Sequence, residues 1–238
     1  MKRKNKNMYK NKKISIYFPC RNESNHLHLV VDSVPDFVDE IILVSNKSTD
    51  NTEIVANTIC KNNPKVRFLI DNREIDGIGY GFASITGLMN ATGDIIVSSD
   101  ADLTYPLDVL TKILDHFLEN EIDFLSCNRY PIKSSKIPLL LQIGVNTLNL
   151  ATHLFHRVKI QDILSGMWVV SKDKRDLLNL GKGDWNLSPE IKIKAARHKD
   201  VKFSEYHINQ NIRAGSTNQS YFKTGFNHLQ YIIVSSMI

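Results

Sequence analysis

The sequence has little cysteine, no long apolar run and no repeated segment. Its three cysteines, Cys20, Cys60 and Cys127, lie far apart and lack metal-ligand spacing. So sparse and odd a set argues against a disulfide framework and is typical of a reducing cytoplasm. No apolar stretch of signal-peptide length follows the basic start, so we expect a cytoplasmic protein. With 42% hydrophobic and 23% charged residues among 238, the composition is that of a soluble globular protein.

Acidic residues are absent from residues 1–13, which carry seven Lys or Arg residues. The rest of the chain has 23 basic and 25 acidic residues, a net charge of −2, although the whole chain has +5. The basicity therefore belongs to a terminal segment, which we expect to be a disordered tail before one folded domain at 14–238. Such a tail can contact anionic lipid or nucleic acid. A solvated leader explains it without a partner, and we expect no nucleic-acid partner.

The most informative segment is a strand that ends in two carboxylates. Apolar and small residues at 95–99 lead to Asp100 and Asp102, with one residue between them. Residues i and i+2 of extended backbone point to the same side, and adjacent carboxylates repel unless a cation lies between them. Mg²⁺ or Mn²⁺, with diphosphate oxygens as its other ligands, is the usual partner. A solvated turn is the alternative, because Asp is common at strand ends.

Strands and helices alternate through the first half of the chain. Predicted strands span residues 14–18, 40–44, 66–70, 95–99 and 123–126. The helices between them begin near Ser24 as N-cap, near Thr49 or Asp50, after the glycine-rich turn at 77–81, and at Pro106. This order predicts a mainly parallel sheet flanked by helices, with the ligand beyond the carboxyl ends of the strands. We expect the segments 19–23, 45–50 and 100–102 to meet at that edge.

The second half begins with an uncharged stretch. Residues 137–156 contain no Asp, Glu, Lys or Arg but are too rich in Asn, Gln, Thr and His for a membrane span. Two interpretations stay open, a helix packed on the core and an interfacial helix in a membrane surface. The apolar end at 226–238 leaves the same two open. Further predicted elements are strands at 166–170 and 201–209 and a helix at 188–197.

A series of short motifs runs in order along the chain. They are Ile16–Glu23, Glu40–Asp50, Gly79-Tyr80-Gly81 through Gly87 and Gly93-Asp94, Asp100-Ala101-Asp102, Asn128-Arg129-Tyr130, Asp162 with Ser165-Gly166, Glu190, and Arg213-x-Gly215-Ser216. Each is weak alone. The ordered set, over about residues 14–220, resembles the family 2 inverting glycosyltransferases, most closely the branch that transfers sugar to polyprenyl (dolichol-type) phosphate. The resemblance implies a single nucleotide-binding domain of the glycosyltransferase A type, which is Rossmann-like.

The resemblance also implies roles for individual residues. Those expected to bind substrate are Pro19, Arg21, Asn22, Glu23, Ser45, Asn46, Gly79, Asp100, Ala101 and Arg129. The expected metal ligands are Asp100, Asp102 and Thr104, and the expected catalytic residues are Asp102, Arg213 and Asp162. Breaking a sugar–diphosphate bond puts negative charge on the leaving nucleotide, which a metal at Asp102 and the Arg213 guanidinium would neutralise.

The chain departs from the family in three places. Ser45 and Asn46 stand where the family carries a pair of acids, which leaves the choice of donor open. Thr104 stands where the polyprenyl-phosphate branch often has Gln. No pair of acids in the second half offers a general base, although Asp162 and then Asp184 are candidates. A phosphate acceptor needs no base, whereas a sugar hydroxyl does, so the gap favours a lipid phosphate.

We therefore expect a metal-dependent transferase that moves a hexose from a nucleotide diphosphate sugar to a polyprenyl phosphate. It would work at the inner face of the cell membrane with peripheral membrane contact. Two alternatives stay open: an enzyme that extends a cell-surface or lipid-linked glycan at a hydroxyl group, and a non-catalytic nucleotide-sugar binder, which Ser45 and Asn46 motivate. The Gly77-x-Gly79-x-Gly81 turn does not indicate a dinucleotide fingerprint, because its spacing differs and it follows the third strand.

Overall fold

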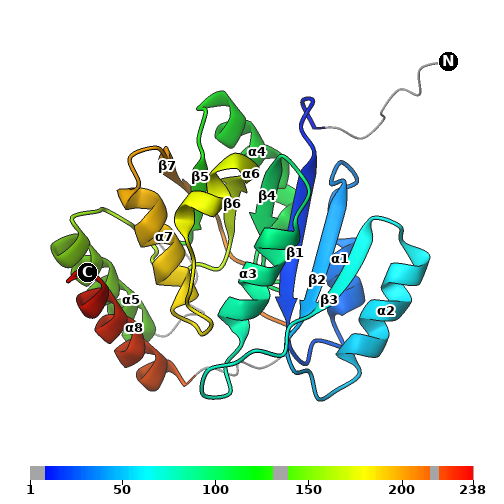
Figure 1. The fold of residues 1–238 in the computed structure, drawn as a ribbon, viewed down its shortest axis with the longest axis horizontal. Helices are drawn as coiled ribbons and strands as arrows, with labels where there is room; N and C mark the ends of the chain where they lie inside the picture. The colour runs from blue at the N-terminus through cyan, green and yellow to red at the C-terminus, as the bar shows by residue number, and fades with distance from the viewer. Residues whose placement is uncertain (1–8, 131–138, 215–219, 238) are drawn as a thin grey trace.

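The computed structural model describes residues 9–130, 139–214 and 220–237. Its centre is a seven-stranded sheet in the order β3-β2-β1-β4-β6-β5-β7 (Figure 1). The strands are β1 (Ile14–Cys20), β2 (Glu40–Ser45), β3 (Val66–Ile70), β4 (Ile95–Ser98), β5 (Phe124–Asn128), β6 (Trp168–Ser171) and β7 (Phe203–His207). β6 runs antiparallel to both of its neighbours, while the other neighbouring pairs are parallel. The predicted α/β fold with a mainly parallel sheet is confirmed.

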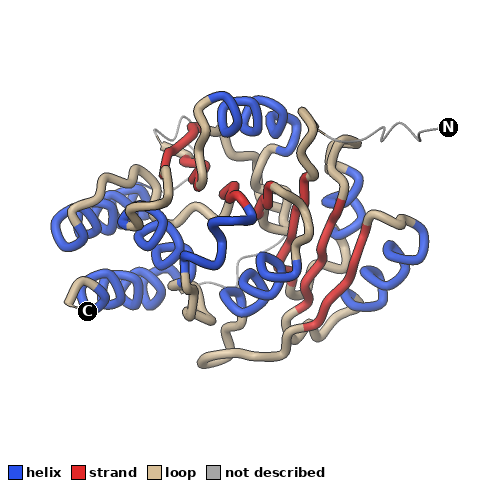
Figure 2. The backbone as a smooth tube through the Cα atoms, turned by 45° about the horizontal axis from the view of Figure 1, so that its top comes forward, coloured by secondary structure: helices blue, strands red, loops and turns tan. Residues whose placement is uncertain are grey.

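Helices cover both faces of the sheet (Figure 2). One face packs on α1 (Leu27–Asp32), α2 (Thr52–Asn62) and α4 (Leu110–Glu119), and the other on α3 (Tyr80–Asn90) and α7 (Leu187–Arg197). A 3-10 turn at Leu107–Val109 precedes α4, and β6 is followed by the short α6 (Lys172–Arg175) and a 3-10 turn at Asp176–Leu178. Because helices cover both faces of the sheet, a ligand can approach it at the ends of the strands.

The first helix starts later than predicted, and Ser24 does not cap it. His26 occupies the capping position, and no side chain bonds the free N–H groups there. The backbone N–H of Ser24 instead donates to Asp50 Oδ2 at 3.2 Å, which ties the loop after β1 to the loop after β2. Asp50 also accepts the N–H of Thr52, the first residue of α2, at 2.9 Å. These bonds join two of the predicted site segments at their bases.

The predicted disordered tail is shorter than residues 1–13. Residues 9–12 form a turn, in which the N–H of Lys12 donates to the carbonyl of Tyr9 at 2.9 Å. Tyr9 Oη donates to Asp115 Oδ1 at 2.5 Å, and Lys10 Nζ lies 2.6 Å from the same carboxylate on α4. The prediction of disorder is therefore wrong for residues 9–13, while residues 1–8 lie outside the described residues.

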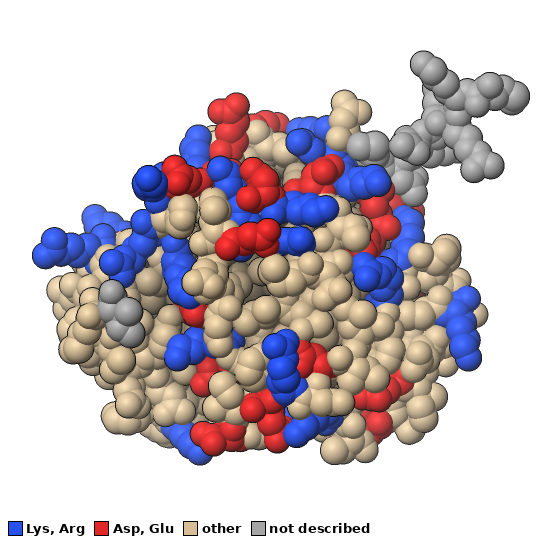
Figure 3. Space-filling model, in the orientation of Figure 1, with Lys and Arg blue, Asp and Glu red and all other residues tan. Residues whose placement is uncertain are grey.

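α5 (Leu139–His156) and α8 (Tyr221–Ser235) pack against each other beyond β7 (Figure 1). Their inner sides bury Leu148, Ala151 and Ile232 in a small core shared with α7. Their outer sides expose apolar side chains, from 45% of Phe155 to 79% of Phe222. Most of the surface over this pair is uncharged in Figure 3. Among the described residues, no helix combines the length and apolarity that crossing a bilayer requires.

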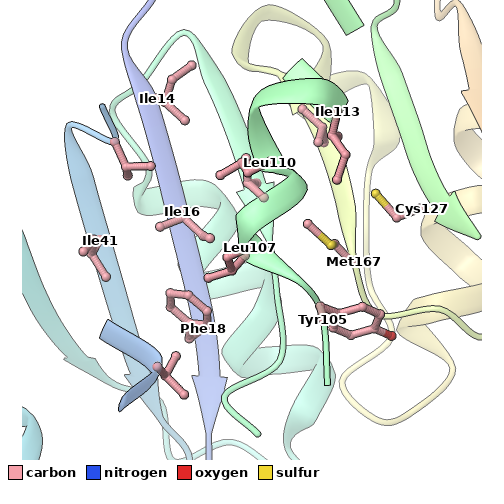
Figure 4. Packing of buried hydrophobic residues seen from close by; sticks show 14 of the residues in the cluster. Ile14, Ile16, Phe18, Ile41, Tyr105, Leu107, Leu110, Ile113, Cys127 and Met167 are labelled. Atoms are coloured by element: carbon pink, nitrogen blue, oxygen red, sulfur yellow. The ribbon is translucent and has the colours of Figure 1, made fainter. Parts of the chain in front are cut away.

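The largest core cluster fixes the position of β1 and β4. Ile14, Ile16 and Phe18 point from β1 toward Leu110 and its neighbours on α4 (Figure 4). All of these side chains are fully buried. Tyr17 points to the opposite face and lies so close to α3 that a Cβ at Gly87 would be 2.6 Å from its ring. Dense packing on both faces holds the carboxyl ends of these strands rigidly.

Candidate active site

A cavity of about 310 Å³ opens at the carboxyl ends of β1, β2 and β4. It is lined by Pro19–Glu23 at the end of β1 and just after it, Asn46 after β2, residues 100–102 after β4, Gly77–Tyr80 before and at the start of α3, and by Ala83, Trp185 and Arg213. The three strand-end segments that the sequence placed at one edge thus meet around one pocket. Ser45, Thr104, Arg129 and Asp162 are not in its lining.

Asp102 is held by the loop that carries Arg213. Its Oδ1 accepts the N–H of Thr104 at 3.0 Å, and its Oδ2 lies 3.2 Å from Arg213 Nη2. The N–H of Ala214 donates to the carbonyl of Asp102 at 2.8 Å, which pins the loop to the strand end. Asp102 is 3% exposed, whereas the Arg213 side chain is 42% exposed. The pocket therefore has a buried carboxylate paired with a guanidinium that is itself partly exposed.

The other two acids of the pocket lie in an unfavourable electrostatic environment. Burial, followed by the negative charge of Asp102, raises the pKa of Asp100 to about 7. The same two causes raise the pKa of Glu23 to about 7. The nearest hydrogen-bond donor to Asp100 is Tyr80 Oη, 3.5 Å from its Oδ1. A cation between these carboxylates would remove their repulsion.

The donor set fits a hard divalent cation that also binds a ligand. The described residues hold no group of three His, Cys, Asp or Glu side chains arranged around a single metal position. Mg²⁺ is often held by one or two carboxylates together with substrate phosphates, which matches Asp100 and Asp102. The hydroxyl of Thr104 is buried and has no hydrogen-bond partner among the residues that the structure describes. The backbone N–H of Thr104 bonds Asp102, so Thr104 lies next to that carboxylate, and its role as a metal ligand stays a prediction.

Asn46 occupies the far side of the pocket with a fixed amide orientation. Its Nδ2 donates to the carbonyls of Asp71 at 2.5 Å and Arg73 at 2.9 Å, which uses both amide hydrogens. Its Oδ1 is a buried acceptor for which the described part of the chain supplies no donor. Gly79 packs on this amide so closely that a Cβ there would lie 2.1 Å from Oδ1, so only glycine fits. This orphaned acceptor suits an N–H group of a nucleoside base.

Ser45 has a different environment from the one predicted. Its hydroxyl donates to Glu53 Oε1 at 3.1 Å and lies 3.0 Å from the Ser48 hydroxyl, below the pocket. Arg21 and Asn22 line the pocket, and their side chains also connect the loop after β1 to two neighbouring loops. Arg21 Nη1 donates to the carbonyl of Gly77 at 2.6 Å, and Asn22 Oδ1 accepts the N–H of Thr49 at 2.7 Å. We infer that Ser45 supports the loop rather than contacting a donor directly.

Arg129 and Asp162 form a buried ion pair outside the pocket lining. Arg129 Nε donates to Asp162 Oδ2 at 2.7 Å, and Nη2 donates to Oδ1 at 3.0 Å. Burial alone would raise the pKa of Asp162, but the pairing with Arg129 keeps it below its ordinary value. A carboxylate engaged on both oxygens by a guanidinium is a poor proton acceptor, which argues against the predicted base role of Asp162. The same pairing leaves Arg129 less able to bind a phosphate.

The second candidate base, Asp184, is also engaged. Its Oδ1 accepts the N–H of Asn186 at 3.0 Å, and its Oδ2 accepts Asn186 Nδ2 at 2.9 Å. These bonds shape the turn before α7. Asp184 thus holds this turn in shape, which argues against its predicted role as a base.

Sequence reasoning missed the aromatic wall of the pocket. Trp185 and Tyr80 both line the cavity, and their rings stack with centroids 4.7 Å apart. Tyr80 lies inside the glycine-rich turn already identified, and Trp185 is one of only two tryptophans in the chain. A large aromatic residue in a short loop rich in glycine and polar residues was the available signal.

Comparison with known proteins agrees with this geometry. Residues 15–174 match the model of the glycosyl transferase family 2. The chain belongs to this family. The low-salt glycan biosynthesis hexosyltransferase Agl6 of Haloferax volcanii is 26% identical over 94% of this chain and 54% of its own length. A dolichol-phosphate mannosyltransferase of Pyrococcus furiosus is 26% identical over 92% of this chain and 62% of its own.

This family 2 chain thus spans about half to three-fifths of the length of these two relatives. A crystal structure of glucosyl-3-phosphoglycerate synthase from Mycobacterium tuberculosis, with Mn²⁺, UDP and phosphoglyceric acid, superposes with a TM-score of 0.68 at 20% identity. The match covers 96% of this chain and 78% of that one. The predicted family and glycosyltransferase A-type fold are confirmed, and the mannosyltransferase relative agrees with the predicted branch.

Proposed function

We propose that this protein is a metal-dependent inverting glycosyltransferase that moves a hexose from a nucleotide diphosphate sugar to a polyprenyl phosphate. The observation that carries the proposal is the meeting of Asp100, Asp102 and Arg213 in one pocket with the unpartnered Asn46 amide oxygen. Asn46 suits the base of such a donor, and the two carboxylates with a cation, together with Arg213, suit its diphosphate.

The order of the strands in the sheet orients the donor, with its base toward β2 and its diphosphate toward β4. Asn46 follows β2, Glu23 follows β1 and Asp102 follows β4, and these strands are neighbours in the sheet. The base lies near Asn46, and the diphosphate lies over Asp100 and Asp102. Mg²⁺ or Mn²⁺ held by Asp102, with Asp100 and Thr104 as further donors, would neutralise charge on the leaving nucleoside diphosphate. The synthase structures with Mn²⁺ or Mg²⁺ and UDP support this choice of ions.

The side chains of the chain supply the remaining electrostatic help. Arg213 lies within reach of the same diphosphate and stabilises the negative charge that develops on it. Because the loop of Arg213 is pinned to the carbonyls of Asp102 and Thr104, this charge is held in place before the reaction. A single in-line displacement by the acceptor then inverts the configuration at the sugar carbon.

The second half of the chain favours an acceptor that is already an anion. Its buried acids in the described regions are all bonded: Asp162 to Arg129, and Glu190 to the N–H groups of Gly181 and Lys182. Glu205, which is half-buried, accepts the N–H of Gln161 on both oxygens. A phosphate oxygen needs no base to attack, so a polyprenyl phosphate fits this arrangement.

The helix pair α5–α8 offers a surface for a lipid-borne acceptor. Neither helix contains Asp or Glu, and its exposed side chains include Leu154, Phe222 and Phe226. Exposed Arg157, Lys159 and Lys223 lie at or near the ends of these helices, and basic side chains border the uncharged area in Figure 3. Apolar side chains with a basic rim suit the interface of an anionic membrane. We therefore propose peripheral contact at the inner face of the cell membrane.

The test uses purified full-length protein, radiolabelled UDP-glucose, UDP-N-acetylglucosamine and GDP-mannose, and polyprenyl phosphate in anionic vesicles. We expect a lipid-linked sugar of inverted configuration that disappears when EDTA removes the metal. Absence of lipid-linked product from every donor would contradict the proposal. As a control, Phe222→Ser with Phe226→Ser should lower transfer to vesicle-bound acceptor but leave donor binding unchanged.

A second candidate is transfer to a hydroxyl of a cell-surface or lipid-linked glycan. The likeness to Agl6, whose name refers to glycan biosynthesis, favours it. Label in a glycan acceptor but not in polyprenyl phosphate would establish it, and loss of turnover in Asp184→Asn with donor binding intact would identify a base. Metal-dependent donor hydrolysis that is lost in Asp102→Ala would exclude a non-catalytic binder.

A further inference from the structure

Trp185, in the loop before α7, lines the same pocket as Asn46, which follows β2. Its ring stacks on Tyr80 at an interplanar angle of 29°, and both rings contribute to the pocket wall. Trp185 is half-buried, so part of its indole stays accessible. The Tyr80 hydroxyl lies near Asp100. Apart from that contact, the proposed sites for the base and the metal do not involve either ring.

The loop that carries Trp185 is built to hold it in this place. A Cβ at Gly81 would lie 2.2 Å from the carbonyl oxygen of Lys182, and a Cβ at Gly183 would lie 2.1 Å from the ring of Phe82. Two glycines thus let the loop press directly on α3, where the N–H of Phe82 donates to the carbonyl of Gly183 at 3.2 Å. Glu190 accepts the N–H groups of Gly181 at 3.1 Å and Lys182 at 2.7 Å.

The residue after Trp185 is fixed as well. Asn186 bonds Asp184 on one side, and its Oδ1 lies 2.8 Å from Nδ1 of the buried His228 on α8. An aromatic ring with so many constraints around it loses little conformational freedom when a ligand binds. Such positioning is more than a loop residue needs for solubility, and it points to a binding role.

The position of the ring relative to the carboxylates selects which part of the ligand it meets. Tyr80 Oη lies 3.5 Å from Asp100 Oδ1. The stacked pair of rings is therefore adjacent to the proposed diphosphate site. Asn46 lies on the β2 side of the carboxylates, and Trp185 precedes α7, which covers the sheet around β6. A donor with its base near Asn46 and its diphosphate over Asp102 has its sugar next to Trp185.

We propose that Trp185, backed by Tyr80, is a shelf that binds the pyranose ring of the donor and determines its affinity. This inference rests on the proposed function, because it concerns the sugar part of the same donor. A pyranose presents C–H bonds on its faces, and their weak positive charge is attracted to the negative face of an aromatic ring. Dispersion over the ring area adds to this attraction.

The test measures binding of matched ligand pairs by calorimetry in the presence of Mn²⁺. The pairs are UDP with UDP-glucose and GDP with GDP-mannose, and the proteins are wild type, Trp185→Ala, Trp185→Phe and the control Leu177→Ala, whose residue is exposed outside the pocket. For the pair that binds, we expect Trp185→Ala to weaken the nucleotide sugar about tenfold and the free nucleotide less than about twofold. Trp185→Phe, which keeps an aromatic ring and the packing on Tyr80, should retain most of the sugar affinity.

Equal losses for nucleotide and nucleotide sugar, or no loss for either, would overturn the shelf and leave the proposed function standing. A wild-type protein that binds none of the four ligands would overturn the proposed function, and the shelf with it. Thermal unfolding of each variant shows whether it is folded. If Trp185→Ala is not, the comparison of Trp185→Phe with Trp185→Leu decides the question by the same criterion.

Discussion

Two aspartates, the half-buried Asp100 in the pocket and the fully buried Asp162 beyond it, have opposite surroundings. Asp162 has a guanidinium on both oxygens, and this pairing keeps its pKa below the ordinary value despite burial. Asp100 has a neighbouring carboxylate and one distant hydroxyl, and its pKa rises to about 7. The protein completes the surroundings of Asp162 from its own residues but leaves those of Asp100 incomplete.

The same contrast extends to the uncharged and cationic groups around each aspartate. In the pocket of Asp100, the Asn46 amide oxygen is buried without a partner among the described residues, and so is the Thr104 hydroxyl next to Asp102. Near Asp162, the fully buried Lys192 donates to the carbonyls of Asp162 at 2.9 Å and Ser165 at 2.6 Å. Buried polar groups are normally hydrogen-bonded, so a cluster of exceptions indicates a ligand, and a completed cluster indicates a structural role.

The largest expected effect is the loss of activity in Asp102→Asn. This substitution removes a carboxylate from the proposed metal site, so we expect turnover to fall at least about 10²–10³-fold. Because Asp102 repels Asp100 and Glu23 in the absence of a cation, unfolding in metal-free buffer should show little loss of stability. Steady-state kinetics and urea denaturation measure the two effects. Asp108→Asn, at an exposed site, is the control, and a large loss of metal-free stability in Asp102→Asn would contradict the contrast.

The opposite result is expected for the Asp162 cluster. Asp162→Asn leaves the Arg129 guanidinium buried without its counter-charge, and breaking such a pair costs about 3–5 kcal/mol of unfolding free energy. Urea denaturation measures this loss. The double variant Arg129→Met with Asp162→Leu should be less destabilised than the two single variants combined, because no charge is left unpaired. A stable Asp162→Asn protein with abolished turnover would instead restore the catalytic role predicted from sequence.

The strand-end residues of the proposed donor site could be predicted from sequence, because each follows directly after a strand that the local pattern predicts. The alternation of strands and helices placed residues 19–23, 46 and 100–102 at one edge, and the structure brings them around one cavity. The roles of Ser45, Arg129 and Asp162 could not be read in this way. Arg129 and Asp162 are 33 positions apart in the chain. The residue type alone does not reveal whether a carboxylate will form an ion pair with such a distant cation. The stacking of Tyr80 on Trp185 joins segments even further apart in the chain.

The tie between α8 and the Trp185 loop predicts a pH effect on stability. Burial lowers the pKa of His228 to about 4, with nearby Asp184 raising it and Lys192 lowering it. The unfolded chain, with a histidine pKa near 6.5, therefore takes up a proton before the folded protein does. Stability from His228 is complete above about pH 6.5 and falls by up to about 3 kcal/mol toward pH 4. His228→Asn keeps a donor toward Asn186 and should show a smaller fall in urea denaturation; an equal fall would contradict this assignment.

The smallest expected effect is that of Thr104→Val. This variant tests whether the Thr104 hydroxyl binds a metal. The Thr104 hydroxyl makes no hydrogen bond to any residue in the described ranges, so its replacement by an isosteric methyl should change the unfolding free energy by less than about 1 kcal/mol. If the hydroxyl donates to a cation beside Asp102, the Mg²⁺ or Mn²⁺ concentration for half-maximal turnover should rise about two- to tenfold, since such supporting oxygens tune metal affinity. Metal titrations of turnover measure this shift, and Thr104→Ser, which retains the oxygen, should stay close to wild type. Identical titrations for Thr104→Val and wild type would remove Thr104 from the proposed metal site and leave the two aspartates as its protein ligands.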